Sequence, residues 1–288
     1  MERLYKMGPV TLAFRELPQD RCFPFRDWKL DAFALSEGRA DIAVCWEPGK
    51  EMPASEPVWT EKSLCAKREL YQLSDGSMLW QQIQPATKQV QLQLKLHPDR
   101  QKISLLVDST QTFGMAALES LTFLIFYAFL SRNVLSFHGL LLENRGKGIL
   151  IAAPSGEGKT THGRLWREHK NALILNGDRS SCWEENGKWM AFGTPWCGTS
   201  GEYINRTVPV QALVILKRGQ INRVTPIEDL TLLQEVMPHV LYPYWEKALT
   251  GKMFDLLDRF LSRIPVLLLE CTADAQAVDA LSSYLEKL

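Results

Sequence analysis

The sequence predicts an α/β fold with two parts, a β-rich N-terminal domain and a second domain with a mixed β-sheet and flanking helices. Alternating and β-branched runs dominate residues 1–110, which is typical of paired strands. From residue 111 onward, apolar strands are interspersed with helical patterns, as in layered α/β domains. A buried strand at residues 149–152 leads directly into a glycine-rich turn and a helix. We therefore expect domains at 1–110 and 111–288.

In the N-terminal domain, turn residues separate six expected strands. Asp75-Gly76 lies between two of them and is a strong hairpin signal. Strict alternation over residues 90–96 predicts one buried face and one face in water. This domain shows no catalytic grouping. The expected strands are residues 10–14, 40–46, 69–73, 78–83, 90–96 and 103–107, and the tryptophans interpreted as packing residues, rather than as a ligand platform, are Trp28, Trp46, Trp59 and Trp80.

A long helix, apolar nearly all round, is expected over residues 112–131 and would join the two domains. Beyond it, Asn186-Gly187 marks a second hairpin, and Asp274 is expected to cap the last helix. The expected strands are residues 137–143, 148–152, 172–176, 181–184, 188–193, 210–217, 223–226 and 265–271. The expected helices begin near residue 158, at 227 and at 244, and end at about 168, at 236 and at 262.

The composition is that of an ordinary globular protein of 288 residues, with 45% hydrophobic and 23% charged residues. Lys+Arg and Asp+Glu both number 33, so no net field favours nucleic acid or an anionic membrane, and neither is expected as a partner. The six cysteines show no C-x-x-C spacing. We therefore predict a reduced, cytoplasmic chain with free thiols.

We expect neither a signal peptide nor a membrane-spanning segment. The first residues, MERLYK, lack an apolar core. The most apolar run, residues 121–130, is too short to cross a bilayer and is flanked by Glu119 and Arg132. We expect a buried helix there.

A phosphate-binding P-loop is predicted where the strand ILIA is followed by APSGEGKT (residues 153–160). Glycines allow a tight path with inward-pointing N–H groups, and the helix N-terminus adds its positive dipole end. Lys159 would reach the β- and γ-phosphates, and the Thr160 hydroxyl would bind Mg²⁺. Ala153 replaces the first glycine of the pattern, and an ordinary turn with a surface lysine is the alternative. The predicted nucleotide-binding residues are Pro154, Ser155, Gly156, Glu157, Gly158, Lys159, Thr160 and Thr161.

Four motifs occur in one order: His138-Gly139, APSGEGKT, LNGDR (residues 175–179) and GTPWCG (residues 193–198). In order and spacing they resemble the HPr kinase / ATP-dependent phosphoenolpyruvate carboxykinase superfamily. More narrowly, they resemble the short HPr-kinase-related, carboxykinase-like proteins of bacteria. The resemblance covers residues 135–218 and implies ATP and Mg²⁺ as cofactors.

The resemblance also implies roles for three further residues. Asp178, at the carboxyl end of a strand beside the loop, would bind Mg²⁺ directly or through water, with a turn or cap residue as the alternative. His138 would approach the γ-phosphate from the neighbouring strand, unless it is a hydrogen-bonded core histidine. Arg206 stands where relatives carry a phosphate-binding arginine, with a solvated surface arginine as the alternative.

The chain departs from the family pattern at Gly177, where relatives usually carry the first of two adjacent acids. In those relatives, one acid helps to deprotonate the acceptor and the other binds metal. If Asp178 binds metal, the base is His138, Glu202 or no protein group. The oxaloacetate-binding elements of the carboxykinases and the HPr kinase signature loop are not recognisable.

Three functions remain open at this stage. The first is an ATP-dependent kinase that transfers the γ-phosphate to a hydroxyl of a peptide or protein serine or of a small molecule; relatives in bacterial peptide-maturation clusters phosphorylate peptide serines. The second is a nucleotide-binding regulatory protein with little turnover, suggested by Gly177 and Ala153. The third is decarboxylation and phosphorylation of oxaloacetate. A homo-oligomer is compatible with any of them.

Two remaining features receive structural interpretations. Trp196-Cys197 is interpreted as part of a rigid turn that packs near the nucleotide. His162, His169 and His239 show no metal-ligand spacing, and His169 is expected at a helix C-terminus.

Overall fold

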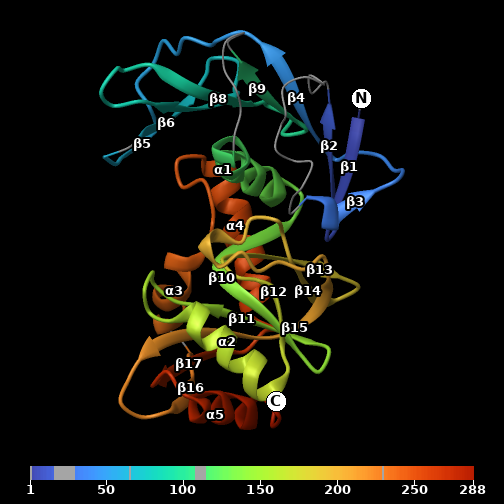
Figure 1. Ribbon diagram of the computed structural model, residues 1–288, viewed down its shortest axis with the longest axis vertical. Helices are drawn as coiled ribbons and strands as arrows, with labels where there is room; N and C mark the ends of the chain where they lie inside the picture. Colours follow the sequence, from blue (N-terminus) through green and yellow to red (C-terminus); the bar gives the residue numbers. More distant parts are fainter. Residues whose placement is uncertain (1, 16–29, 65, 108–114, 229) are drawn as a thin grey trace. The chain divides into compact units, whose positions relative to one another are not determined.

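The computed structural model describes residues 2–15, 30–64, 66–107, 115–228 and 230–288 (Figure 1). They form two compact units, unit 1 (Met1–Ala128) and unit 2 (Phe129–Leu288), each built on a large mixed sheet. The fold is therefore mixed α/β. None of the helices in the described residues is long and apolar enough to cross a lipid bilayer.

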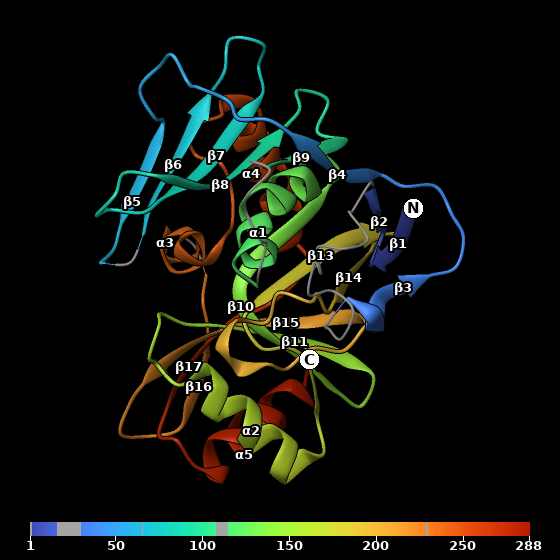
Figure 2. The same ribbon diagram turned by 45° about the horizontal axis from the view of Figure 1, so that its top comes forward.

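Unit 1 is a sheet of nine strands within the described residues, in the order β3-β1-β2-β4-β9-β8-β7-β6-β5. β4 pairs in parallel with β2 and β9, and the other neighbours are antiparallel. Figure 2 shows β5, β6 and β7 side by side in this sheet. The strands are β1 (Glu2–Met7), β2 (Val10–Arg15), β3 (Ala34–Leu35), β4 (Ile42–Pro48), β5 (Trp59–Lys62), β6 (Lys67–Gln72), β7 (Met78–Ile83), β8 (Val90–Leu96) and β9 (Lys102–Val107), with a 3₁₀ turn η2 (Asp31–Phe33).

The predicted hairpin at Asp75-Gly76 is confirmed. Gly76 has φ = +82°, the Asp75 carboxylate accepts from the Ser77 N–H, and β6 and β7 pair antiparallel around the turn. Packing of the tryptophans is confirmed for Trp80 and Trp59, which contact Phe123 of α1 (Met115–Ser131). Trp28 lies outside the described residues.

The prediction that one face of β8 lies in water is wrong at Gln93, which is 2% exposed. Its amide donates to Gln81 Oε1 at 3.0 Å and to the Glu51 carbonyl at 2.8 Å, and its oxygen accepts from the Glu51 N–H. The Glu51 segment covers this polar face, and the hydrogen bonds make burial of the amides tolerable. Alternation of polar residues indicates two faces but does not tell which of them another segment covers.

Unit 2 contains eight strands within the described residues, in the order β11-β10-β13-β14-β15-β17-β16, with β12 also paired to β10. β11 also pairs with β15, in parallel, and β17 runs parallel to β15. The long strands β10 and β15 each take part in more than one ladder. The strands are β10 (Val134–Asn144), β11 (Lys147–Ala152), β12 (Leu173–Asn176), β13 (Arg179–Glu185), β14 (Lys188–Phe192), β15 (Thr207–Arg218), β16 (Arg223–Pro226) and β17 (Val266–Cys271).

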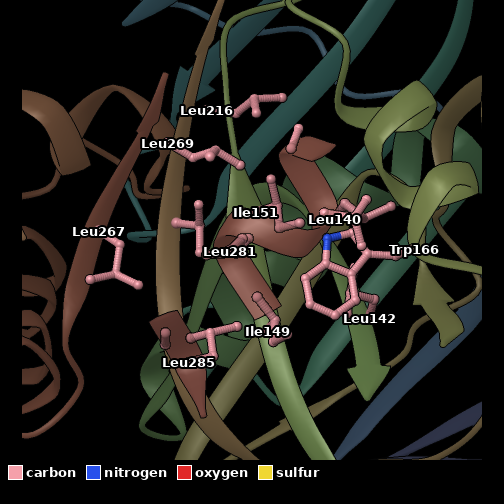
Figure 3. Close-up of a cluster of buried hydrophobic side chains, with 14 of the residues drawn as sticks. Leu140, Leu142, Ile149, Ile151, Trp166, Leu216, Leu267, Leu269, Leu281 and Leu285 are labelled. Atoms are coloured by element: carbon pink, nitrogen blue, oxygen red, sulfur yellow. The ribbon is translucent and has the colours of Figure 1, made fainter. Parts of the chain in front are cut away.

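Helices pack on both faces of this sheet. α2 and α5 lie side by side in Figure 1 and share a core with β10, β11, β15 and β17. Figure 3 shows Trp166 of α2 and Leu281 and Leu285 of α5 directed into that core. On the other face, Phe260 of α4 packs against Phe137 and Trp189. The helices are α2 (Lys159–Lys170), α3 (Leu230–Val236), α4 (Lys247–Leu261) and α5 (Ala275–Leu285), with 3₁₀ turns η3 (Gly198–Ser200) and η4 (Met237–His239).

Most of these helices and strands lie where local patterns in the sequence predicted them. Asp274 caps α5 by accepting from the Ala277 N–H, as predicted, and His169 lies in the last turn of α2. The helix expected at 244–262 begins three residues later than predicted, at Lys247, and the helix expected at 227–236 is described as Leu230–Val236, with residue 229 outside the described residues. Four cysteines are free and buried, namely Cys45, Cys182, Cys197 and Cys271, whereas Cys22 and Cys65 lie outside the described residues.

Candidate functional site

The glycine-rich loop (residues 153–158) connects β11 to α2. Gly156 and Gly158 have φ angles of +83° and +105°, which side-chain-bearing residues rarely adopt. A Cβ on either glycine would meet no atom within 4 Å, so the left-handed backbone, and not crowding, requires glycine here. Gly158 is the N-cap residue of α2, so the N–H groups of the first helical turn face the loop.

Lys159, the first residue of α2, folds back over the loop. Its ammonium donates to the carbonyl of Ala153 at 2.6 Å and to that of Pro154 at 3.4 Å, and the residue is only 9% exposed. Burial lowers the pKa of Lys159, and the nearby Asp178 carboxylate offsets part of this effect. A buried cation near a helix N-terminus is energetically costly unless an anion joins it.

His138 and Asp178 form a pair beside this lysine, with His138 Nε2 3.1 Å from Asp178 Oδ1. Burial alone would raise the pKa of Asp178, but the hydrogen bond to His138 and the charges of Arg179 and Lys159 hold it below its usual range. The carboxylate is thus ionised and can only accept, so His138 Nε2 carries the hydrogen. The sequence separates His138, Lys159 and Asp178 widely, and the fold brings them together.

Strand direction explains this meeting. β11, β12 and β15 run the same way, because β10 pairs antiparallel with both β11 and β12 and β11 pairs in parallel with β15. Their carboxyl ends therefore meet at one edge, which carries the glycine-rich loop, Asp178 and Arg218. The Arg218 guanidinium donates to the Gly156 carbonyl and lies 3.8 Å from Glu157. The sequence analysis did not single out Arg218.

Asn176 is a positioning residue that the sequence analysis also missed. Its side-chain oxygen accepts from the N–H groups of Asp178 at 2.8 Å and Arg179 at 2.7 Å. Its amide donates to the carbonyls of Thr194 and Trp196 and to the Thr194 hydroxyl. This fully buried side chain links the LNGDR and GTPWCG motifs, which explains structurally why they occur together. Trp196 and Cys197 are buried in that turn.

Gly177 has no space for a side chain. A Cβ there would lie 1.9 Å from Ser200 Oγ and 2.6 Å from Ser200 Cβ. The Ser200 hydroxyl in turn donates to the Cys197 carbonyl at 2.6 Å, which fixes its position. The LNGDR motif therefore carries a single acid, Asp178, where the resemblance implies two adjacent acids.

Two residues considered from the sequence are engaged elsewhere. Arg206 Nη2 donates to Glu143 Oε1 at 2.8 Å, and its Nε lies 2.7 Å from Oε2, close enough for an ion pair although the angle does not make a hydrogen bond. Glu143 pairs with Gly148, about 13 Å along β11 from its loop end. Both Glu202 carboxylate oxygens accept from Arg167, about 12 Å along α2 from Lys159. The structure does not bring either Arg206 or the Glu202 carboxylate to the loop.

His239 is the histidine that the sequence analysis set aside and that the fold places at this site. The isolated bridge Phe137↔Val240 and the Leu241 N–H···O=C Ser136 bond hold its segment against β10. His239 is close enough to Lys159 and His138 for both to act on its titration. Burial, with these two neighbours, lowers the pKa of His239 to about 4, and Glu235 opposes the shift.

A cavity of about 280 Å³ adjoins the loop on the side of β17. Its lining combines apolar residues with polar ones: Leu216, Cys271 and Ala273 on one hand, and Glu157, Thr161, His162, Arg218 and Thr272 on the other. His162 Nε2 accepts from the Trp166 indole N–H at 3.1 Å, so a neutral ring carries its hydrogen on Nδ1. Burial lowers the pKa of His162 to about 4, which keeps the ring neutral.

The donor set suits a nucleotide-bound Mg²⁺ better than a resident metal ion. Within the described residues, no group of three or more His, Cys, Asp or Glu side chains could hold a metal. Asp178 offers one carboxylate, and Thr160, half-buried at the second position of α2, offers a hydroxyl. Mg²⁺ is commonly bound by one or two carboxylates together with water and substrate phosphates.

Comparison with known proteins shows no family for this chain. No protein-family model matches the chain, and none of the curated proteins is similar to it in sequence. Among solved structures, the chain is similar to the Hpr(Ser) kinase/phosphatase from Coxiella burnetii, with a TM-score of 0.31 and 11% identity, over 53% of this chain and 97% of that one. A similarity this weak supports no argument about function. Any such argument depends on the geometry of the site.

Proposed function

We propose that this chain is an ATP-dependent phosphotransferase of the HPr-kinase-like type, which transfers the γ-phosphate to a hydroxyl of a peptide or protein serine or of a small molecule. One observation carries the proposal. Lys159 and Asp178 lie within electrostatic reach of each other at the edge where the glycine-rich loop begins, and Asp178 holds His138. In-line phosphoryl transfer needs such a combination of cation, metal-binding carboxylate and polar group near the γ-phosphate.

In this proposal the glycine-rich loop is a P-loop. Backbone N–H groups of residues 155–161 bind the phosphates, and the Lys159 ammonium moves from the Ala153 and Pro154 carbonyls to the β- and γ-phosphates. Thr160 and Asp178 hold Mg²⁺, which neutralises charge on the phosphates when bound. Arg218 supplies a guanidinium at the loop, in the role that the resemblance gave to Arg206.

The cavity beside the loop is where we place the nucleoside. The apolar part of its lining suits a base, and Arg218 and Gly158 of the loop both line it. The Nδ1–H of His162 offers one hydrogen-bond donor to a base acceptor. The acceptor of the phosphoryl group would lie on the other side of Lys159, near His138.

A nucleotide-binding regulatory protein with little turnover is the second candidate. The crowding of Gly177 by Ser200 favours it, because the site cannot carry the second acid that assists the acceptor in relatives. The two candidates share nucleotide binding and differ in phosphoryl transfer.

The test is calorimetric titration of the full chain with ATP·Mg²⁺, followed by transfer assays with serine-containing peptides, free serine and sugars. Lys159→Ala and Asp178→Asn should each weaken ATP·Mg²⁺ binding at least tenfold, whereas Lys170→Ala at the far end of α2 should not. Tight binding without any transfer would favour the regulatory protein. Formation of phosphoenolpyruvate from oxaloacetate would indicate the carboxykinase reaction instead. No binding at millimolar ATP·Mg²⁺ would exclude all three.

A further inference from the structure

Some group of the site has to receive the proton of an attacking hydroxyl, and few of its side chains are available. Gly177 cannot carry an acid, and both Glu202 oxygens accept from Arg167. Asp178 accepts from His138 and is the proposed metal ligand. His138 donates its Nε2–H to Asp178, so only its Nδ1 could accept a proton. One further titratable side chain lies close to His138 and Lys159.

That group is His239. The isolated antiparallel bridge between Phe137 and Val240 brings residue 239, the last of η4, beside residue 138. Phe137 faces α4, where it contacts Phe260, whereas Leu140 and Leu142 face α2. Side chains alternate along a strand, so His138 lies on the α2 side. The position of residue 239 beside residue 138 agrees with the electrostatic effect of His138 and Lys159 on His239.

The imidazole of His239 is buried but keeps some contact with solvent. The residue is 6% exposed, and no described residue hydrogen-bonds to either ring nitrogen. Neither nitrogen is among the buried polar atoms that lack a partner, so both keep contact with solvent. A histidine serving only the core would be expected to use its nitrogens in hydrogen bonds, as His162 does with Trp166.

We propose that His239 is a catalytic residue of this site, accepting the proton of the hydroxyl that attacks the γ-phosphate. The proposal rests on the proposed phosphotransferase function. An oxygen lone pair of the acceptor forms the bond to Pγ, the bond from Pγ to the β–γ bridging oxygen breaks with its electrons going to ADP, and the acceptor proton passes to a ring nitrogen of His239 and then to water.

The electrostatic setting suits this role. Burial, together with Lys159 and His138, keeps the His239 ring neutral, and Glu235, which opposes this shift, is itself paired with Lys217 at 2.6 Å. A neutral imidazole can accept a hydrogen bond from the acceptor and orient it. The proton leaves late, when the oxygen is already bonded to phosphorus and strongly acidic, so a weakly basic ring suffices.

The first experiment needs no variant. Ring ¹⁵N signals of the histidines are recorded in the full chain with ADP·Mg²⁺ and then with ADP·Mg²⁺ plus aluminium fluoride, which mimics the transferring phosphoryl group. The His239 nitrogens should shift on addition of aluminium fluoride but not with ADP·Mg²⁺ alone. The exposed His169, at the far end of α2, should not respond. His239 signals unmoved in a complex that does form would overturn the proposal.

The second experiment uses His239→Asn and His239→Gln, which each keep one polar atom of the ring, with His169→Asn as the matched control. Phosphate release from ATP, with water as the attacking hydroxyl, should fall at least 100-fold in both His239 variants. ATP·Mg²⁺ affinity should stay within about twofold. Retained phosphate release in either variant would overturn the role of His239 while leaving the phosphotransferase intact. Failure of the wild-type chain to bind ATP·Mg²⁺ would instead overturn the proposed function.

Discussion

The backbone of Gly198 packs directly against the carboxylate of Asp178. A Cβ on residue 198 would lie 2.7 Å from Asp178 Cγ and 2.9 Å from Oδ2. Gly198 has φ = +59°, so glycine is favoured there for its conformation as well. The GTPWCG turn thus fixes the position of the Asp178 carboxylate, and the hydrogen bond from the Asp178 N–H to Asn176 fixes the Asp178 backbone.

Gly198→Ala should displace the Asp178 carboxylate and break its contact with His138, because the added methyl group occupies its place. ATP·Mg²⁺ affinity should fall at least tenfold, which calorimetry measures. Gly201→Ala is the matched control: φ is +70° there, but a Cβ meets nothing within 4 Å, so it adds only the backbone strain of about 1 kcal/mol. Equal affinities for the two variants would show that the contact does not position the acid.

Gly177→Asp should destabilise unit 2 by about 1–3 kcal/mol, because its Cβ overlaps Ser200. In the double variant Gly177→Asp/Ser200→Gly, most of the stability should return, since both clashing atoms are gone. Urea unfolding of the single and double variants measures the difference. If Gly177→Asp alone is as stable as the wild type, Ser200 does not exclude the second acid.

Arg206→Met should lower stability by about 1–3 kcal/mol without changing ATP·Mg²⁺ affinity, because it leaves the buried Glu143 carboxylate unpaired. This loss of stability is smaller than for a fully buried ion pair, because the Arg206 side chain is half exposed. The double variant Arg206→Met/Glu143→Met should recover most of the loss. A tenfold loss of affinity with unchanged stability would instead support the phosphate role predicted from the sequence.

His162 should make stability depend on pH. Its pKa is about 4 in the folded chain against an ordinary 6.5, so below pH 6.5 the unfolded chain takes up the proton first and unfolding is favoured. The loss begins near pH 6.5 and is complete below pH 4, with a total of about 3 kcal/mol.

His162→Gln can retain the acceptor for the Trp166 indole and removes this titration, so its stability should fall less between pH 7.5 and 4.5 in urea unfolding. His239, which has a similar pKa, contributes equally to both proteins and cancels in the comparison. His169→Gln, on the exposed end of α2, should follow the wild type. A parallel pH dependence of wild type and His162→Gln would contradict the assignment.

Much of the fold was predictable because its signals are local. Asp75-Gly76 requires a particular turn, Asp274 caps its own helix, and Gly156, Gly158 and Lys159 follow a strand in one continuous segment. In each case the residues that determine the structure lie within a few positions of one another. Gln93 marks the limit of such reasoning, since the segment that covers it is about forty residues away in the sequence.

The sequence by itself determined the strand, the turn and the helix that form the glycine-rich loop, and it identified His138 and Asp178 as candidate partners of that loop. Only the tertiary structure decided which other residues join them. Arg206 and Arg218 flank the same strand, β15, and no local pattern tells which end faces the loop. Parallel pairing of β15 with β11 places Arg218 there and leaves Arg206 with Glu143. His239 reaches the site through a bridge to Phe137, about a hundred residues earlier, because strand order and direction are properties of the whole sheet and not of any one segment.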